Sequence, residues 1–145
     1  MKHVDIFTDG ACSGNPGKGG WAALLRYGAK EKTLSGAEAQ TTNNRMEMTA
    51  LIEALSSLKE KCSLTLHTDS QYLMNGSTKW LPSWKAKGWK TAAKKDVLNV
   101  DLWKKLDVLL QKHQIEEWIW VKGHNGHLEN ETVDTLAREA ILTLK

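Results

Sequence analysis

The chain has 145 residues, of which 41% are hydrophobic and 26% charged, with 11 Gly and 2 Pro. This composition is typical of a globular domain and excludes collagen-like, disordered and low-complexity classes. The longest strictly apolar run, Trp21 to Leu25, is too short to cross a membrane, and Asp5 and Asp9 interrupt the only place for a signal-peptide core. We therefore expect a single domain spanning residues 1–145, a monomer in the cytoplasm with no membrane partner.

The net charge of +3 is unevenly distributed along the chain. Between residues 79 and 95 there are six lysines and no acidic residue, so the rest of the chain is net negative. Trp80, Trp84 and Trp89 lie in the same segment, and ammonium groups interleaved with flat aromatic rings suit a phosphodiester backbone. The alternative is a solvated, lysine-rich helix whose tryptophans anchor it to the core.

The first half of the chain predicts a sheet followed by a helix. Short β-type runs at 3–8, 20–27 and 31–35, separated by Gly-containing turns, predict an antiparallel meander. Apolar residues at helical spacing predict a helix that follows residue 44 and ends near residue 61. Alternation then predicts a strand at 63–68, and the resulting βαβ unit makes this strand parallel to its neighbour in the sheet.

The second half predicts further helices and one more strand. A helix begins at residue 70, Pro82 and Gly88 break up the lysine-rich segment, and a new helix begins near Asn99. A strand at 115–121 and an amphipathic helix through residues 133–144 complete the chain. The order of elements predicts an α/β fold, a mixed sheet of about five strands that combines the antiparallel meander with parallel strands and is flanked by α-helices.

Two predicted strands end in an aspartate. These aspartates are Asp9 in Phe7-Thr8-Asp9-Gly10 and Asp69 in His67-Thr68-Asp69-Ser70. In open α/β sheets the reactive crevice lies outside the carboxyl ends of the strands, so we expect both aspartates to face one site. The alternative for each is an ordinary turn residue.

Two further carboxylates fall near predicted helix starts. Glu47 shares a helical stripe with Leu51 and Leu58, which points it toward the sheet, unless it is the capping-box partner of Asn44. Asp134 lies beside the apolar stripe of the last helix, and its alternative role is to complement the helix dipole.

Several carboxylates in one crevice repel each other. They would be forced to protonate unless hard cations neutralised them, so the set predicts Mg²⁺ or Mn²⁺ bound by oxygen ligands. Cysteines and histidines are too scattered along the chain for a zinc site.

A series of short motifs spans nearly the whole chain. They are Ile6-Phe7-Thr8-Asp9-Gly10, Gly14-Asn15-Pro16-Gly17, Thr41 to Glu47, Thr68 to Tyr72, Gly88-Trp89-Lys90-Thr91, Val121-Lys122-Gly123-His124, and Asn130 to Asp134. In this order they resemble the motifs of ribonuclease HI, the bacterial type 1 ribonuclease H family. The resemblance implies the ribonuclease H-like fold and an endoribonuclease that hydrolyses the RNA strand of RNA/DNA hybrids, leaving 3′-hydroxyl and 5′-phosphate ends.

The resemblance also implies roles for individual residues. Asp9, Glu47, Asp69 and Asp134 would be the catalytic, metal-binding carboxylates, holding two Mg²⁺ ions for which Mn²⁺ could substitute. His124 would shuttle a proton or assist product release, although a Gly-flanked loop histidine can also be a bystander. The hybrid would contact amide and hydroxyl side chains and a basic protrusion at about residues 79–98, namely Asn15, Thr42, Asn43, Asn44, Gln71, Trp80, Trp84, Lys85, Lys87 and Lys90.

Two other functions fit parts of this pattern. A DNA-processing nuclease of the same fold would use similar acidic residues, but the basic protrusion and the segment Thr42 to Glu47 argue against it. A catalytically silent hybrid-binding module is the other alternative. The presence of His124 and all four carboxylates makes silence hard to explain.

Overall fold

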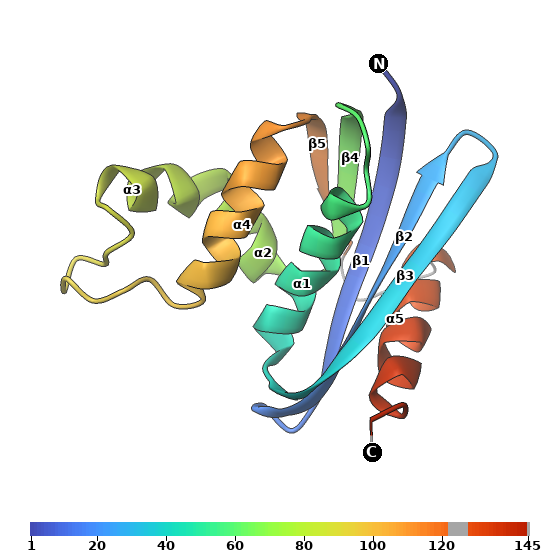
Figure 1. The fold of residues 1–145 in the computed structure, drawn as a ribbon, viewed down its shortest axis with the longest axis horizontal. Helices are drawn as coiled ribbons and strands as arrows, with labels where there is room; N and C mark the ends of the chain where they lie inside the picture. The colour runs from blue at the N-terminus through green and yellow to red at the C-terminus, as the bar shows by residue number, and fades with distance from the viewer. Residues whose placement is uncertain (122–127, 145) are drawn as a thin grey trace.

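The computed structural model describes residues 1–121 and 128–144, and the chain forms a mixed sheet with helices on both faces (Figure 1). The five strands lie in the order β3-β2-β1-β4-β5. They are β1 (His3–Ser13), β2 (Gly17–Tyr27), β3 (Lys30–Thr41), β4 (Ser63–Thr68) and β5 (Gln114–Trp120). The first three strands are antiparallel neighbours, whereas β4 pairs in parallel with both β1 and β5. The predicted combination of meander and parallel strands is confirmed.

Helices cover the two faces unequally. They are α1 (Asn43–Ser56), α2 (Gln71–Asn75), the π-helical turn η1 (Gly76–Trp80), α3 (Leu81–Ala86), α4 (Val100–Gln111) and α5 (Leu128–Ile141). One face carries α1, which packs on β1, β2 and α4, and the opposite face carries α5 (Figure 1). Beyond α4, α3 projects away from the sheet (Figure 1). Among the described helices, none combines the length and apolar character that a membrane crossing needs.

Some predicted boundaries were wrong. The meander strands are longer than expected, because β1 pairs with β2 as far as Ser13↔Lys18 and so stays extended well beyond Thr8. By contrast, α1 is shorter than predicted and ends at Ser56. The Ala54 carbonyl oxygen accepts hydrogen bonds from both the Ser57 hydroxyl, at 2.7 Å, and the Ser57 backbone N–H, at 3.2 Å, which close the end of the helix.

Strand alternation divides the core into two layers. Ile6 packs into the larger layer with Leu64 and Trp103, between the sheet and α1 with α4. Its neighbour Phe7 points to the other face and packs with Val133 and Ala137 under α5. Glycine at position 20 of β2 permits this packing, because an added Cβ atom would overlap the carbonyl oxygen of Ala137. The two layers bring α1 and α5 close to opposite faces of β1.

Candidate active site

The parallel pairing of β1 with β4 ends before β1 does. Its last paired residues are Phe7 and His67, whereas β1 continues to Ser13 alongside β2. Beyond Phe7, therefore, no strand among the described residues pairs with the β4 side of β1, and groups from both faces of the sheet can reach it. Asp9 lies on this stretch, and Asp69 follows the last residue of β4. The prediction that Asp9 ends its strand was wrong, but Asp9 does lie where the parallel pairing ends.

Helix α1 brings Glu47 to this stretch of β1. A Cβ atom added at Gly10 would lie 2.6 Å from the Glu47 backbone nitrogen, so only glycine allows the helix to approach so closely. The helix starts after Thr42, whose hydroxyl accepts a hydrogen bond from the Arg45 N–H at 3.2 Å. Because Thr42 is the N-cap and Glu47 is only 3% exposed, the capping-box alternative with Asn44 is wrong.

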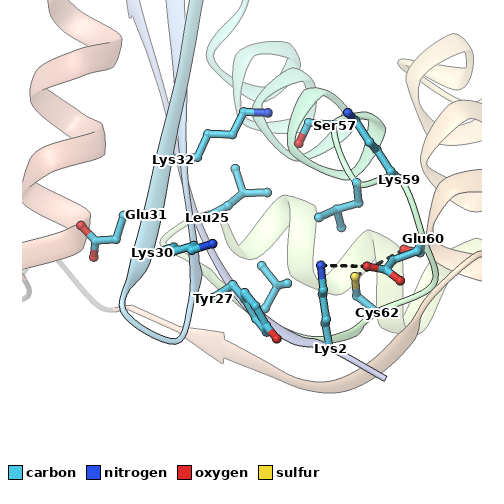
Figure 2. A pocket seen from close by; sticks show the side chains of 12 residues that line it. Lys2, Leu25, Tyr27, Lys30, Glu31, Lys32, Ser57, Lys59, Glu60 and Cys62 are labelled. Atoms are coloured by element: carbon cyan, nitrogen blue, oxygen red, sulfur yellow. Dashed lines mark hydrogen bonds and ion pairs between the residues drawn. The ribbon is translucent and has the colours of Figure 1, made fainter.

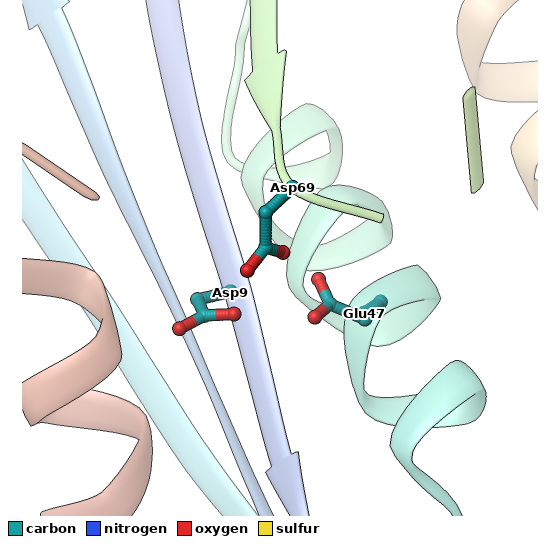
Figure 3. Close-up of side chains that lie close together, drawn as sticks. All are labelled: Asp9, Glu47 and Asp69. Atoms are coloured by element: carbon teal, nitrogen blue, oxygen red, sulfur yellow. The ribbon is translucent and has the colours of Figure 1, made fainter. Parts of the chain in front are cut away.

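Three carboxylates from three separate elements come together here. One oxygen each of Asp9, Glu47 and Asp69 lies within 4.8 Å of the others, and Figure 3 shows the side chains converging. The Gly10 N–H donates to Asp9 Oδ1 at 2.9 Å, which fixes the orientation of that carboxylate. The Trp120 indole N–H donates to the Asp69 backbone carbonyl at 3.1 Å and ties this residue to β5.

The cluster is electrostatically costly without a cation. Burial raises the pKa of Asp9 to about 8, and the neighbouring Asp69 and Asp134 act in the same direction. Burial, followed by the charges of Asp9 and Asp69, raises the pKa of Glu47 well above its usual value. Glu47 Oε2 is buried and has no hydrogen-bond partner among the described residues. An all-oxygen, electron-rich site of this kind fits a hard divalent cation.

Asp134 approaches the cluster from the opposite face of the sheet. It lies on α5, forms an ion pair with Arg138 one turn later, and raises the pKa of Asp9, but it does not belong to the group of three carboxylates whose oxygens lie within 4.8 Å of one another. The first turn of α5 contains Glu129 and Glu131 instead. Since Asp134 lies beyond that turn, the helix-dipole alternative does not account for it.

The predicted contact residues with amide or hydroxyl side chains differ in their burial and in their hydrogen bonds. Asn15, between β1 and β2, accepts a hydrogen bond at Oδ1 from the Asn43 N–H at 3.2 Å, so these two exposed residues are neighbours. Thr42 caps α1, Asn44 is half-buried, and Gln71 is exposed at the start of α2. His124 lies outside the described residues.

The lysine-rich segment combines anchored aromatic rings with exposed charges. The Trp84 ring lies 5.8 Å from Trp80 and 5.3 Å from Trp103 of α4, measured between centroids, and both Trp84 and Trp89 pack on the core. Trp80 keeps 38% of its surface exposed. The predicted lysines differ in their pairing, because Lys85 pairs with Asp107 at 3.2 Å and Lys90 with Asp96, whereas Lys87 is exposed and makes no ion pair with a described residue.

Sequence reasoning missed a polar network that holds the helices together. The Arg45 guanidinium forms two hydrogen bonds with the Asp101 carboxylate, at 3.0 and 2.8 Å, and a third with Asn99 Oδ1 at 3.2 Å. The Tyr72 hydroxyl accepts hydrogen bonds from Asn99 Nδ2 and from the Trp103 indole, at 3.1 and 3.2 Å. These residues are far apart in sequence, and no local pattern connects them.

Comparison with known proteins identifies the family. The model of the RNase H family matches residues 1–142. This chain belongs to the ribonuclease H family. It is therefore a nuclease of the ribonuclease H type.

Full-length relatives agree with this assignment. The chain is 61% identical over 142 residues to a ribonuclease H of Novosphingobium aromaticivorans, covering 98% of this chain and 99% of the relative. It is also 61% identical over 141 residues to a ribonuclease H of Hydrogenovibrio crunogenus, covering 97% of each.

Solved structures confirm the ribonuclease H-like fold. LC9-RNase H1, a type 1 RNase H with the type 2 active-site motif, is 30% identical with a TM-score of 0.89, over 100% of this chain and 74% of that one. LC11-RNase H1 in complex with an RNA/DNA hybrid is 21% identical with a TM-score of 0.66, over 95% of this chain and 96% of that one, and supports the fold alone.

Proposed function

We propose that this chain hydrolyses the RNA strand of RNA/DNA hybrids at the carboxylate cluster, as an endonuclease that leaves 3′-hydroxyl and 5′-phosphate ends. The observation that carries the proposal is the convergence of Asp9, Glu47 and Asp69 within 4.8 Å, at the point where β1 extends beyond its pairing with β4. Asp134, on α5 at the opposite face, lies outside this group of three but raises the pKa of Asp9. Relatives that are 61% identical over nearly their whole length are ribonucleases H, which supports the same activity here.

The carboxylates are suited to hold Mg²⁺, with Mn²⁺ as a possible substitute. Two such ions, when bound, would supply water activation at neutral pH and stabilisation of the leaving oxygen. Asp9, Glu47, Asp69 and Asp134 would hold them. Gly10 fixes the Asp9 carboxylate through its N–H, and Glu47 brings a buried oxygen atom that makes no other hydrogen bond to the described residues.

Different parts of the surface would bind the two strands of the hybrid. Asn15, between β1 and β2, and Asn43, at the start of α1, are neighbours and offer amide groups that can recognise a 2′-hydroxyl of RNA. Thr42, Asn44 and Gln71 would contribute to the same surface. The protrusion at residues 79–98, with Trp80, Trp84, Lys85, Lys87 and Lys90, would bind the phosphates of the DNA strand.

His124 would act on the protons of the reaction. By its motif position it would transfer a proton or assist product release, a contribution of about 10²-fold to 10⁴-fold for a positioned group. A monomeric state and a cytoplasmic location remain predictions.

A substrate panel tests the proposed activity. In Mg²⁺, the protein should make internal cuts in the RNA of a hybrid and leave duplex DNA, duplex RNA and free RNA largely intact. Asp9→Asn should abolish cutting while hybrid binding in Ca²⁺ persists. Glu53→Gln, which removes one charge from the exposed face of α1, is the matched control and should cut normally. Efficient cutting of duplex DNA would favour a DNA-processing nuclease, and binding without cutting would favour a silent module.

A further inference from the structure

A cavity lies away from the carboxylate cluster. It is open to solvent, has a volume of about 460 Å³, and is lined by the start of β1, the hairpin between β2 and β3, and the segment that follows α1 (Figure 2). This volume falls within the range of small-molecule sites. Val4, which lines the cavity, precedes Asp9 on β1 by about 17 Å of extended strand, so a ligand here would not occupy the active site.

The floor of the cavity is apolar. Val4 and Leu25 are 4% and 6% exposed, and Leu58 covers the floor from the segment after α1. Tyr27 forms one side, with 45% of its surface exposed (Figure 2). A flat apolar body placed on this floor would bury carbon surface that water now contacts.

The rim of the cavity carries an excess of positive charge. Lys2, Lys30, Lys32 and Lys59 surround the floor (Figure 2). Lys2 is already engaged, because its Nζ pairs with Glu60 at 2.9 Å and lies 5.2 Å from the centre of the Tyr27 ring.

The other three lysines are available to a ligand. Lys30, Lys32 and Lys59 are exposed and form no ion pair within the part of the chain that the structure describes. Glu31 also lines the cavity, but its carboxylate is paired with Arg26 at 2.6 Å. Three ammonium groups that form no ion pair with any described residue therefore border an apolar floor.

We propose that this cavity binds a phosphate monoester with a flat aromatic body, of which a nucleoside 5′-monophosphate is the simplest example. A phosphate monoester carries nearly two negative charges at neutral pH and three acceptor oxygens, which matches the three ammonium groups of Lys30, Lys32 and Lys59. Its aromatic ring covers Leu25 and Leu58 beside Tyr27. The site is distinct from hybrid binding and does not depend on the proposed nuclease mechanism.

Titration with adenosine 5′-monophosphate tests the proposal. The intact protein, in EDTA so that no divalent cation bridges the nucleotide to the carboxylates, is followed by ¹H–¹⁵N NMR. We expect shifts at the amides of Leu25, Tyr27 and Leu58, and none at Asp9 and Gly10. The Kd obtained from these shifts is compared with those of adenosine and of inorganic phosphate, each of which should bind at least about tenfold more weakly because it lacks one half of the interaction.

Two variants with equal changes in net charge distinguish specific binding in the cavity from a general effect of the protein's charge. Lys30→Gln, Lys32→Gln and Lys59→Gln together should raise the Kd for the nucleotide about tenfold or more. Lys18→Gln, Lys105→Gln and Lys112→Gln remove the same charge from exposed positions that do not line the cavity, and should leave the Kd nearly unchanged. All six positions are exposed, so both variants should fold normally, which their melting temperatures check.

Several outcomes would overturn the proposal. Shifts confined to the carboxylate cluster or to residues 79–98 would place the nucleotide elsewhere. Equal affinity for inorganic phosphate would remove the role of the apolar floor, and equal affinity for adenosine would remove that of the lysines. Equal loss of affinity in both triple variants, or no loss in either, would show that Lys30, Lys32 and Lys59 do not bind the phosphate specifically. Their aliphatic stems would then only cover apolar surface.

Discussion

Gly10 of β1 and Glu47 of α1 are so close that a Cβ atom added to Gly10 would lie 2.6 Å from the Glu47 backbone nitrogen and 2.8 Å from the backbone carbon of Met46. The overlap is with backbone atoms, which a rotamer change cannot relieve. Glycine at position 10 therefore sets the distance between α1 and β1, and with it the approach of Glu47 to Asp9.

Gly10→Ala should displace α1 and separate the carboxylates. We expect a loss of about 1–3 kcal/mol in the free energy of unfolding, typical of overpacking, together with a marked fall in kcat on a hybrid substrate. Denaturant unfolding and steady-state cleavage measure the two effects.

Gly36→Ala provides the control for this substitution. Its added Cβ would also be crowded, at 2.7 Å from the Trp21 ring, but between β2 and β3 and away from the cluster. It should lower stability and leave kcat nearly unchanged in the folded protein. An equal fall in kcat in both variants would show that crowding in the sheet, and not the position of Glu47, controls activity.

Removing a cluster carboxylate should stabilise the metal-free protein. Burial raises the pKa of both Asp9 and Glu47. For Asp9 the pKa rises from its usual value of 3.8 to about 8, so between these two pH values the folded chain binds more protons at Asp9 than the unfolded chain does. Metal-free stability should therefore fall as pH rises through this window. Glu47→Gln should flatten that dependence and, at neutral pH in EDTA, raise the melting temperature by about 2–4 °C for each 1 kcal/mol gained. A lower melting temperature at every pH would contradict the assigned repulsion.

Metal binding should release protons near neutral pH. The pKa of Asp9, raised to about 8, means that this carboxyl holds a proton in much of the metal-free population at pH 7, and a cation must displace it. Calorimetric titration with Mg²⁺ in buffers of different ionisation enthalpy measures the number of protons released. We expect this number to decrease as pH rises above 8, and to be smaller in Asp9→Asn. Metal binding without proton release at pH 7 would argue against a protonated cluster.

The ion pair between Arg45 and Asp101 should affect substrate binding more than chemistry. It joins the start of α1 to the start of α4, which follows the lysine-rich segment in sequence and packs against its tryptophans. Since both side chains are partly exposed, Asp101→Asn should weaken substrate binding by only about 0.5–1 kcal/mol. This corresponds to a rise of about two- to fivefold in KM with little change in kcat. The exchanged pair Arg45→Asp with Asp101→Arg should recover part of the loss. A fall in kcat alone would place the pair in the chemical step.

The three predicted protrusion lysines should differ in their contribution to the salt dependence of hybrid binding. Lys87→Gln should reduce the slope of log K against log salt by about 0.9, the value for one phosphate contact on a B-like duplex. Lys85→Gln and Lys90→Gln should each reduce it less, because these ammonium groups are already paired with Asp107 and Asp96. Lys61→Gln, an exposed lysine outside the segment, is the control. Equal slopes in Lys87→Gln and Lys61→Gln would make the segment a solvated helix.

The sheet could be predicted because its pattern is local, whereas the strand ends could not. Alternation of apolar residues marks the centre of β1, but its last residues, up to Ser13, are extended because β2 pairs with them. Likewise, Leu58 continues the apolar spacing of α1 and packs on the core, although the helix has already ended at Ser56.

The same distinction holds for the site. The inward direction of Glu47 followed from helix geometry, because Leu51 lies one turn later on the same face and both are buried. The contact of Arg45 with Asp101 joins residues 56 positions apart, and the sequence around neither residue indicates it. The pairing of Lys85 with Asp107 joins residues 22 positions apart and was likewise not indicated by the local sequence.

The measurement that tests the account most directly is the rate of RNA cleavage in a saturating hybrid, as a function of Mg²⁺ concentration, for Glu47→Gln and Glu53→Gln. Both substitutions remove one negative charge from α1, but only Glu47 belongs to the carboxylate cluster. The account predicts that Glu47→Gln lowers the maximal rate by at least about 100-fold while hybrid binding in Ca²⁺ is retained, and that Glu53→Gln stays within about twofold of the unmodified protein. Equal rates in the two variants at every Mg²⁺ concentration would contradict the assignment of the cluster as the site of hydrolysis.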